Sequence, residues 1–422
     1  LNHVAKNNKE CLNVPEFEEA LRRTEEQFLP EKCFCYENPI SYAEYSPDGK
    51  YIATMFGDNY NDVVLLSAED GSVINTLNLD KVVQVLSFSE DGNYIVTSDV
   101  ENVVKIWSVK DGNCMKVLDD KFNDIYEMEL SDDGKYLLVA SSDAEVWSVE
   151  DEKCLYTFDC GEYDVTSVRF TPDEKYVITD TKDNVIGLWS LENGQQLWEA
   201  KDEKGYFGNI IDISPNGEYL AATTMYQPVS NLFSMKTGEL LWTIKHHEND
   251  EISAVLFSKD GKYIATSGNN EFKLWSVDDR KCMWSVDNFN IDRDERIDHG
   301  QAAEIRLSPN GKYLCATNSY SGSRLFSIEN GECVLEVKNS TISDFSSDGT
   351  HFVTVCENVI LLWSLEHIEN VRLYKQKLDN PERYRSELFT PDGKYVLRSG
   401  RGIELWSVES GKLIDTLYGI SG

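Results

Sequence analysis

The sequence is poor in positively charged residues. Its 422 residues include 40 lysines and arginines against 74 aspartates and glutamates, a formal net charge of −34. Such a surface repels the phosphate backbones of nucleic acids, so we expect no nucleic-acid partner for the chain as a whole. The acidic balance favours solubility, and it also suits a partner protein with a basic surface. Other proteins are therefore the partners that the charge favours.

Long apolar runs are also missing. No stretch of 18 apolar residues occurs, so we expect no membrane-spanning segment. The chain begins Leu1-Asn2-His3, without a starting methionine or a signal-peptide pattern. We therefore expect a segment of a longer protein, with domains before or after it. The expected location is the cytoplasm, with the nucleus as the alternative.

Catalytic and metal-binding motifs are absent as well. The six histidines are scattered, and the adjacent pair His246-His247 faces opposite ways if it lies on a strand. The sequence has no Gly-x-Ser-x-Gly elbow, no phosphate-binding glycine loop and no zinc-type Cys/His spacing. We therefore predict that the chain is no enzyme and holds no cofactor and no metal.

One sequence phrase recurs from about residue 31 onward. It consists of an apolar residue, Ser or Thr, an Asp/Asn-Gly turn, and an aromatic residue that opens an apolar strand, as in Tyr45–Tyr51 and Phe88–Tyr94. Nine copies occur, separated by intervals of about 43 residues, and the fourth has Glu174 in place of the turn glycine. Repetition at this period is typical of propellers and solenoids.

Each copy continues with an alternating strand that ends in a large residue and Ser. The large residue is Trp in six copies: Trp107, Trp147, Trp189, Trp275, Trp363 and Trp406. An acidic turn and a short strand follow, such as Cys114–Leu118. Each unit therefore predicts four short antiparallel strands, with Asp-Gly and Asn-Gly supplying the positive φ angles of tight turns.

A lone sheet of this kind has two apolar faces and is unstable in water. Radial stacking buries both faces between neighbours, which predicts an all-β propeller of four-stranded antiparallel blades over residues 31–422. A single ring of nine blades is favoured. The alternative is seven or eight blades plus an incomplete second ring. Helical spacing over Val14–Phe28 predicts a short helix within an N-terminal helical or linker segment, residues 1–30.

With this pattern the chain resembles the WD-repeat (WD40) family of β-propellers. It departs from the family in having Ser after the Trp position, where Asp is usual, and in lacking the Gly-His pair. The resemblance implies a ring that holds other macromolecules. Similar arrays occur in NACHT and NB-ARC signalling ATPases and in translation-initiation and assembly scaffolds.

The family's buried relay of Asp, His, Ser/Thr and Trp is expected to be mostly broken here. Only Asp183 matches the turn acid, although five threonines match the strand position: Thr54, Thr97, Thr179, Thr266 and Thr354. We therefore expect blades held mainly by apolar packing. Four of the ten cysteines sit at one equivalent position, about one repeat apart, beyond bridging distance: Cys114, Cys154, Cys282 and Cys333. We expect them to be buried strand thiols in a reducing compartment.

The loops that vary between copies are the expected partner surface. Turns between strands one and two, and three and four, share one face and are nearly identical, whereas the loops of the opposite face vary. Tyr, Phe and Arg anchor protein interfaces, and the loop candidates are Tyr60, Tyr206, Phe207, Tyr226, Phe289, Arg293, Arg296 and Tyr320. A basic cluster is a candidate patch for an anionic partner: Arg372, Lys375, Lys377, Arg383 and Arg385. The alternatives are ordinary loop residues and, for the cluster, neutralisation of neighbouring carboxylates.

The sequence therefore predicts a non-catalytic scaffold or recognition module within a larger signalling or assembly protein. The alternative is a propeller enzyme or a small-ligand binder that uses the central channel. The innermost strands offer six charged residues for such a site, which form no recognisable catalytic set: Glu44, Glu129, Arg169, Asp212, Arg306 and Asp344.

Overall fold

The computed structural model describes most of the repeat region. The described ranges are 30–36, 39–56, 62–79, 81–89, 91–118, 122, 124–182, 185–201, 206–225, 229–246, 252–268, 271–287, 304–318, 322–337, 340, 342–356, 358–369, 386–389, 394–399, 403–408 and 412–417. The helix expected over Val14–Phe28 lies outside them.

The described chain is nearly all β and forms nine four-stranded antiparallel sheets. Sheet 1 holds β2 (Ile40–Tyr45), β3 (Tyr51–Phe56), β4 (Asp62–Ser67) and β5 (Val73–Asn78); sheet 2 holds β6 (Val83–Phe88), β7 (Tyr94–Asp99), β8 (Val104–Ser108) and β9 (Cys114–Leu118); sheet 3 holds β10 (Glu127–Leu130), β11 (Tyr136–Ala140), β12 (Ala144–Ser148) and β13 (Lys153–Phe158). Sheet 4 holds β14 (Val165–Phe170), β15 (Tyr176–Thr181), β16 (Val185–Ser190) and β17 (Gln196–Lys201); sheet 5 holds β18 (Tyr206–Ile213), β19 (Tyr219–Met225), β20 (Val229–Ser234) and β21 (Leu240–Lys245); sheet 6 holds β22 (Ile252–Phe257), β23 (Tyr263–Gly268), β24 (Glu271–Ser276) and β25 (Lys281–Asp287). Sheet 7 holds β26 (Glu304–Leu307), β27 (Tyr313–Asn318), β28 (Gly322–Ser327) and β29 (Cys333–Val337); sheet 8 holds β30 (Ile342–Phe345), β31 (His351–Cys356), β32 (Val359–Ser364) and β1 (Lys32–Cys35); sheet 9 holds β33 (Ser386–Phe389), β34 (Tyr395–Ser399), β35 (Ile403–Ser407) and β36 (Leu413–Leu417).

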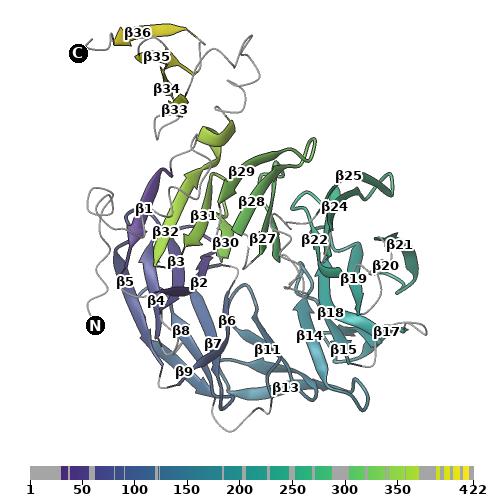
Figure 1. Ribbon diagram of the computed structural model, residues 1–422. Helices are drawn as coiled ribbons and strands as arrows, with labels where there is room; N and C mark the ends of the chain where they lie inside the picture. Colours follow the sequence, from purple (N-terminus) through teal and green to yellow (C-terminus); the bar gives the residue numbers. More distant parts are fainter. Residues whose placement is uncertain are drawn as a thin grey trace, which may run out of the picture.

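Sheets 1 to 8 follow one another around a central axis (Figure 1). The first strand of a sheet lies innermost, because β10 contacts β14, β18 contacts β22 and β30 contacts β2. Apolar side chains fill the space between neighbouring sheets, so the core consists of a succession of clusters rather than one centre. This arrangement explains why each repeat carries apolar residues on both faces.

Strand β1 completes sheet 8 beside sheet 1. It pairs antiparallel with β32, from Lys32 opposite Leu362 to Cys35 opposite Val359. The backbone N–H of Tyr45 in sheet 1 donates to Asp344 Oδ2 in sheet 8 at 3.0 Å. The contacts between sheets therefore return from the eighth sheet to the first.

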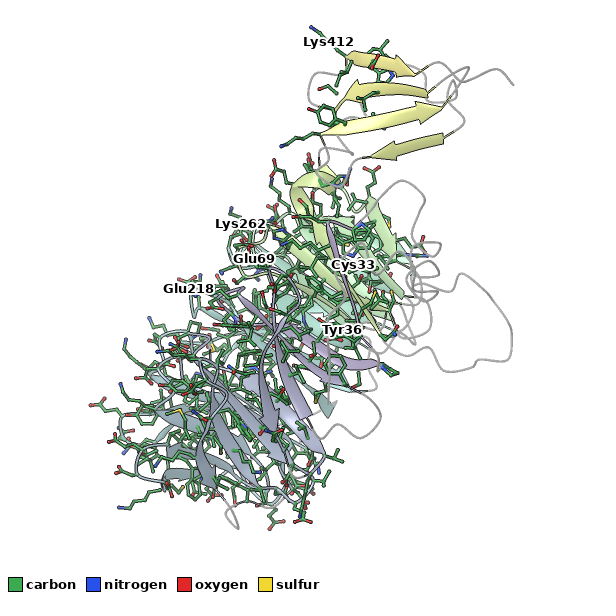
Figure 2. All side chains as sticks on the ribbon, turned by 90° about the vertical axis from the view of Figure 1, so that its left-hand side faces the viewer. Cys33, Tyr36, Glu69, Glu218, Lys262 and Lys412 are labelled. Atoms are coloured by element: carbon green, nitrogen blue, oxygen red, sulfur yellow. The ribbon has the colours of Figure 1, made fainter. Side chains whose placement is uncertain are left out.

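The described sheets do not form the single ring of nine blades that the sequence analysis favoured. Eight sheets surround the axis, as in the eight-blade alternative, and sheet 9 with Lys412 lies outside them (Figure 2). The physical reason is local: β1 occupies the outer position of sheet 8, and a short helix over 365–369 follows β32 where a turn and fourth strand would otherwise come.

The buried relay is more complete than expected. In four sheets the indole N–H of the Trp donates to the Thr hydroxyl at 2.9–3.0 Å: Trp107 to Thr97, Trp189 to Thr179, Trp275 to Thr266 and Trp363 to Thr354. In sheet 6 His246 Nε2 lies 2.7 Å from Thr266 Oγ1. The expectation of a mostly broken relay is therefore wrong for its Thr–Trp half. Asp183 lies outside the described residues.

Tryptophan side chains of outer strands also donate hydrogen bonds to backbone carbonyl groups of the next sheet. Trp198 Nε1 of sheet 4 donates to Met235 O of sheet 5, and Trp284 Nε1 of sheet 6 donates to Ile328 O of sheet 7, both at 2.8 Å. Beside the first bond, Gly238 has a φ angle of +71° and lies under the Trp198 ring. A side chain there meets both a left-handed backbone and the indole.

Gly238→Ala is expected to lower the free energy of unfolding by about 2–4 kcal/mol, because left-handed strain adds to overlap with Trp198. A Cβ at Gly238 falls 2.8 Å from the indole, whereas one at Gly217, with a φ angle of +69°, has nothing within 4 Å. Gly217→Ala therefore serves as the matched control and costs about 1–2 kcal/mol. Urea denaturation measures both, and equal losses contradict the packing argument.

Candidate functional site

The charged residues of the innermost strands hold neighbouring sheets together. Glu129 Oε2 accepts the backbone N–H of Phe170 at 2.8 Å, and Asp212 Oδ2 accepts that of Phe257 at 2.6 Å. Asp344 accepts that of Tyr45 in the same way. Each carboxylate thus joins its sheet to the next one, at the residue directly before the repeat's Ser or Thr. The sequence shows these acids at one equivalent position, but their partners become visible only in the fold.

Two arginines lie among these acids. Arg169 Nη1 lies 2.5 Å from Glu127 Oε1, and Glu127 also accepts from the Ser167 hydroxyl at 2.7 Å. Arg306 pairs with Glu304. The described channel residues therefore form structural charge pairs.

Burial raises the pKa of three carboxyl groups of the innermost strands: Glu44, Asp212 and Asp344. It raises the pKa of Glu44 to about 7, with the charge of Asp344 adding to the effect while the Tyr42 hydroxyl and Arg306 oppose it. Burial likewise raises the pKa of Asp212 to about 6. A raised folded-state pKa means that folding favours the protonated carboxyl.

The chain is expected to lose stability as the pH rises from about 5 to about 8. The contributions of Glu44 and Asp212 are fully present below their usual pKa values and disappear as the pH passes their raised values. The double variant Glu44→Gln, Asp212→Asn removes part of this loss, so its melting temperature falls less over the same range. Asp70→Asn is the control, because hydrogen bonds from Ser72 lower the pKa of Asp70. A double variant with the wild-type pH profile contradicts the assignment.

Two grooves on the turn face flank sheet 4. The groove between sheets 4 and 5 has a volume of about 840 Å³, and the groove between sheets 3 and 4 has one of about 580 Å³. Both are lined by Tyr176 and Leu197, which form the ridge between them. The larger groove is lined by turns that join strands one and two of a sheet and also by a turn that joins strands three and four. Figure 2 places Glu69, Glu218 and Lys262, from turns of both kinds, along one side of the molecule.

The grooves combine exposed apolar side chains with fixed walls. Leu197 is 51% exposed and Leu155, in the narrower groove, is 43% exposed. The wall residue Trp198 is held by its bond to Met235 O, and the Tyr156 hydroxyl donates to Glu192 O at 3.2 Å. Apolar surface on a rigid support is what a protein partner covers with little loss of conformational entropy.

The sequence analysis missed these grooves because it treated the turn face as architecture. A sequence signal exists, since the residue after the bulge of the outer strand is apolar in successive sheets. It is exposed at Ile74, Met115, Leu155, Leu197, Met283 and Ile414. These exposed residues form a repeated apolar feature of the outer strands. The alternating pattern of the strand does not show in the sequence that they are exposed.

The predicted loop-face residues lie mostly outside the described part of the chain. Those outside are Tyr60, Tyr226, Phe289, Arg293, Arg296 and Tyr320, together with the basic cluster Arg372, Lys375, Lys377, Arg383 and Arg385. Tyr206 and Phe207 open β18 and pair with Met225 and Thr224, so their backbone belongs to a strand rather than to a free junction loop. The loop-face site stays a prediction.

The four cysteines at the equivalent outer-strand position were expected to be buried, and this expectation is wrong. Cys114, Cys154, Cys282 and Cys333 are exposed, because the first residue of each outer strand lies at the bulge on the molecule's edge. Within the described ranges no group of three or more His, Cys, Asp or Glu is arranged to hold a metal ion. In the same ranges no helix is long and apolar enough to cross a membrane.

Comparison with known proteins finds the same repeat. Residues 152–190 and 238–276 match the model of the WD domain, G-beta repeat, and residues 18–146 match that of eukaryotic translation initiation factor eIF2A. No curated protein sequence matches the chain. Among solved structures, the computationally designed Ika8 protein superposes with a TM-score of 0.63 at 15% identity, covering 78% of this chain and 98% of that one. At this identity the likeness concerns the fold alone.

Proposed function

We propose that this chain, which belongs to the WD40 β-propeller family, is a protein-recognition module without catalytic activity. The observation that carries the proposal is the pair of grooves beside sheet 4, where exposed Leu155 and Leu197 lie on walls fixed by hydrogen bonds. Because each side chain is about half exposed, covering it completely gains about 1 kcal/mol. The chain's net charge of −34 favours partner proteins with basic surfaces.

A narrower function is supported by the match of residues 18–146 to eukaryotic translation initiation factor eIF2A. On this proposal the partners belong to the translation initiation machinery, and the ring acts as an assembly scaffold. A place in a NACHT or NB-ARC protein, and location in the cytoplasm or nucleus, stay predictions.

The loop face is proposed as a second contact surface. Its candidate anchors from the sequence are Tyr60, Tyr206, Phe207, Tyr226 and Tyr320, whose residue types suit interface anchors. A partner that spans the ring edge uses both faces. Changing these five residues to alanine together is expected to reduce partner recovery, and unchanged recovery removes the loop face from the proposal.

Cross-linking tests the proposed function directly. The tagged full chain is treated in cells with a lysine-directed cross-linker, purified and separated on a density gradient. We expect cross-links from Lys175 and Lys236, beside the grooves, to partner proteins, and co-migration with translation initiation complexes. Cross-links confined to the chain itself contradict protein recognition, and partners unrelated to translation contradict only the narrower function.

A further inference from the structure

Three large exposed side chains lie on the loop face of sheets 2, 3 and 4. Val100, in the turn between β7 and β8, is 56% exposed. Tyr126, directly before β10, is 40% exposed, and Tyr163, shortly before β14, is 54% exposed. None of the three is among the loop-face candidates from the sequence. The described loops that carry and adjoin them, residues 81–82, 99–103, 124–126, 141–143, 159–164 and 181–182, are called the loop-face patch below.

Hydrogen bonds between the sheets join these loops into one surface. The backbone N–H of Ile125, the residue before Tyr126, donates to Asn102 Oδ1 of sheet 2 at 3.1 Å. The Tyr126 hydroxyl donates to Asp164 Oδ2 at 3.0 Å, and Asp164 directly follows Tyr163. The turn of sheet 2 is therefore tied to the loop before sheet 3, and that loop is tied to the one before sheet 4.

The backbone under the loop-face patch is also held in place. The Tyr126 N–H donates to Ala140 O at 2.9 Å, and the Lys182 N–H donates to Asp164 O at 3.0 Å. The Val165 N–H, at the start of β14, donates to Ser141 O at 2.9 Å. Because the loops are fixed before a partner arrives, binding there loses little conformational entropy.

One cation of the chain already lies on an aromatic ring of the loop-face patch. Lys182 Nζ lies 4.4 Å from the centroid of the Tyr126 ring and donates to Asp164 Oδ2 at 2.6 Å. A positive charge is thus held by a phenol ring and a carboxylate together, which is the usual geometry of a cation–π contact. Tyr163 repeats the two residue types, because the exposed Glu162 directly precedes it.

The charges of the loop-face patch favour a cationic ligand. Its described loops carry seven acidic residues and two lysines: Asp99, Glu101, Asp124, Asp143, Asp159, Glu162, Asp164, Lys81 and Lys182. Lys81 pairs with Glu101, and Lys182 pairs with Asp164. Because both lysines are already paired with carboxylates of the patch, the surface keeps an excess of negative charge.

We propose that the loop-face patch binds an arginine-bearing segment of a partner protein, with a guanidinium group on the Tyr163 ring and beside Glu162. A guanidinium group stacks on aromatic rings and forms paired hydrogen bonds with a carboxylate, whereas an ammonium group acts as a point charge. This inference rests on the proposed protein-recognition function and specifies the partner's chemistry. A second copy of this chain is a poor partner, because both copies carry a net charge of −34.

Two short labelled peptides test the loop-face patch. In one peptide glycine alternates with arginine, and in the other glycine alternates with lysine. Fluorescence anisotropy with the full chain is expected to show the arginine peptide binding at least about threefold more tightly than the lysine peptide. The double variant Tyr163→Ser, Glu162→Gln is expected to weaken the arginine peptide at least about tenfold, because it removes both the ring and the carboxylate.

The matched control is the double variant Tyr395→Ser, Glu150→Gln, which makes the same two exchanges at exposed residues outside the loop-face patch. It changes the net charge by the same amount and is expected to leave the binding of both peptides unchanged. Equal binding of the two peptides, or equal effects of the two double variants, overturns the proposal, because unspecific attraction to an acidic surface then explains the binding. The proposed function has its own test, since a full chain that forms no cross-links to partner proteins contradicts recognition itself, whichever peptide it binds.

Discussion

Replacing Phe34 by alanine is expected to lower the free energy of unfolding by about 3–5 kcal/mol. The side chain is 3% exposed, and it lies in the cluster that joins β1 and the rest of sheet 8 to sheet 1. It also packs against Gly71, in a turn of sheet 1. Truncation leaves a cavity at the junction between the first and the eighth sheet. Chemical denaturation followed by tryptophan fluorescence measures the loss.

A second substitution in the same strand controls for effects on β1 as a whole. Lys32 donates to Glu69 O at 2.7 Å at the surface, so Lys32→Ala is expected to cost no more than about 1 kcal/mol. A chain without residues 1–36 loses more stability than Phe34→Ala, because the edge of β32 then has no partner strand. Equal stability of the two point variants contradicts the role assigned to Phe34.

Thr266→Val is expected to cost about 2–5 kcal/mol. Its hydroxyl accepts from Trp275 Nε1 at 2.9 Å and lies 2.7 Å from His246 Nε2, and all three residues are buried. The hydroxyl therefore joins two ring nitrogens, accepting from the indole and bonding to His246 in a direction set by the histidine tautomer. Valine keeps the shape of the side chain but removes the oxygen that bonds to Trp275 Nε1 and His246 Nε2. Each buried polar group left without a hydrogen-bond partner costs about 1–3 kcal/mol.

Thr54→Val is the matched control for the relay. Thr54 is equally buried, but its hydroxyl donates only to Val64 O at 3.0 Å, and sheet 1 has Leu66 at the Trp position. The expected cost is about 1 kcal/mol. Thermal unfolding of both variants measures the difference, and similar losses show that the relay contributes no more than a single hydrogen bond.

Much of the fold could be read from local patterns. The turn after Phe88 and the aromatic Tyr94 predict the hairpin that becomes β6 and β7. Such hairpins depend on turn residues and alternation a few positions apart, so sequence alone identifies them. The sequence analysis expected a mostly broken relay because most repeats lack the acidic turn residue. The Thr97–Trp107 bond needs only cross-strand proximity, which the missing acid does not remove.

The candidate site was largely missed, for a related reason. The grooves arise where sheets 3, 4 and 5 meet, and their lining combines Tyr176, Trp198 and Glu218, which lie in different repeats. The turn that carries Glu218 looks like its counterparts in the sequence. Only the fold brings that turn beside Trp198 and Tyr176 of the preceding sheet.

The sequence by itself determined the repeated unit, its four antiparallel strands and the acidic surface, because turn chemistry, alternation and charge act locally. Only the tertiary structure decided that β1 joins β32 and that sheet 9 stands outside the other eight. Both Lys32–Cys35 and Leu413–Leu417 form the outer strand of a sheet in the structure. Which sheet each one completes depends on contacts between distant segments, where packing beside Phe34 and the helix after Ser364 selects one arrangement.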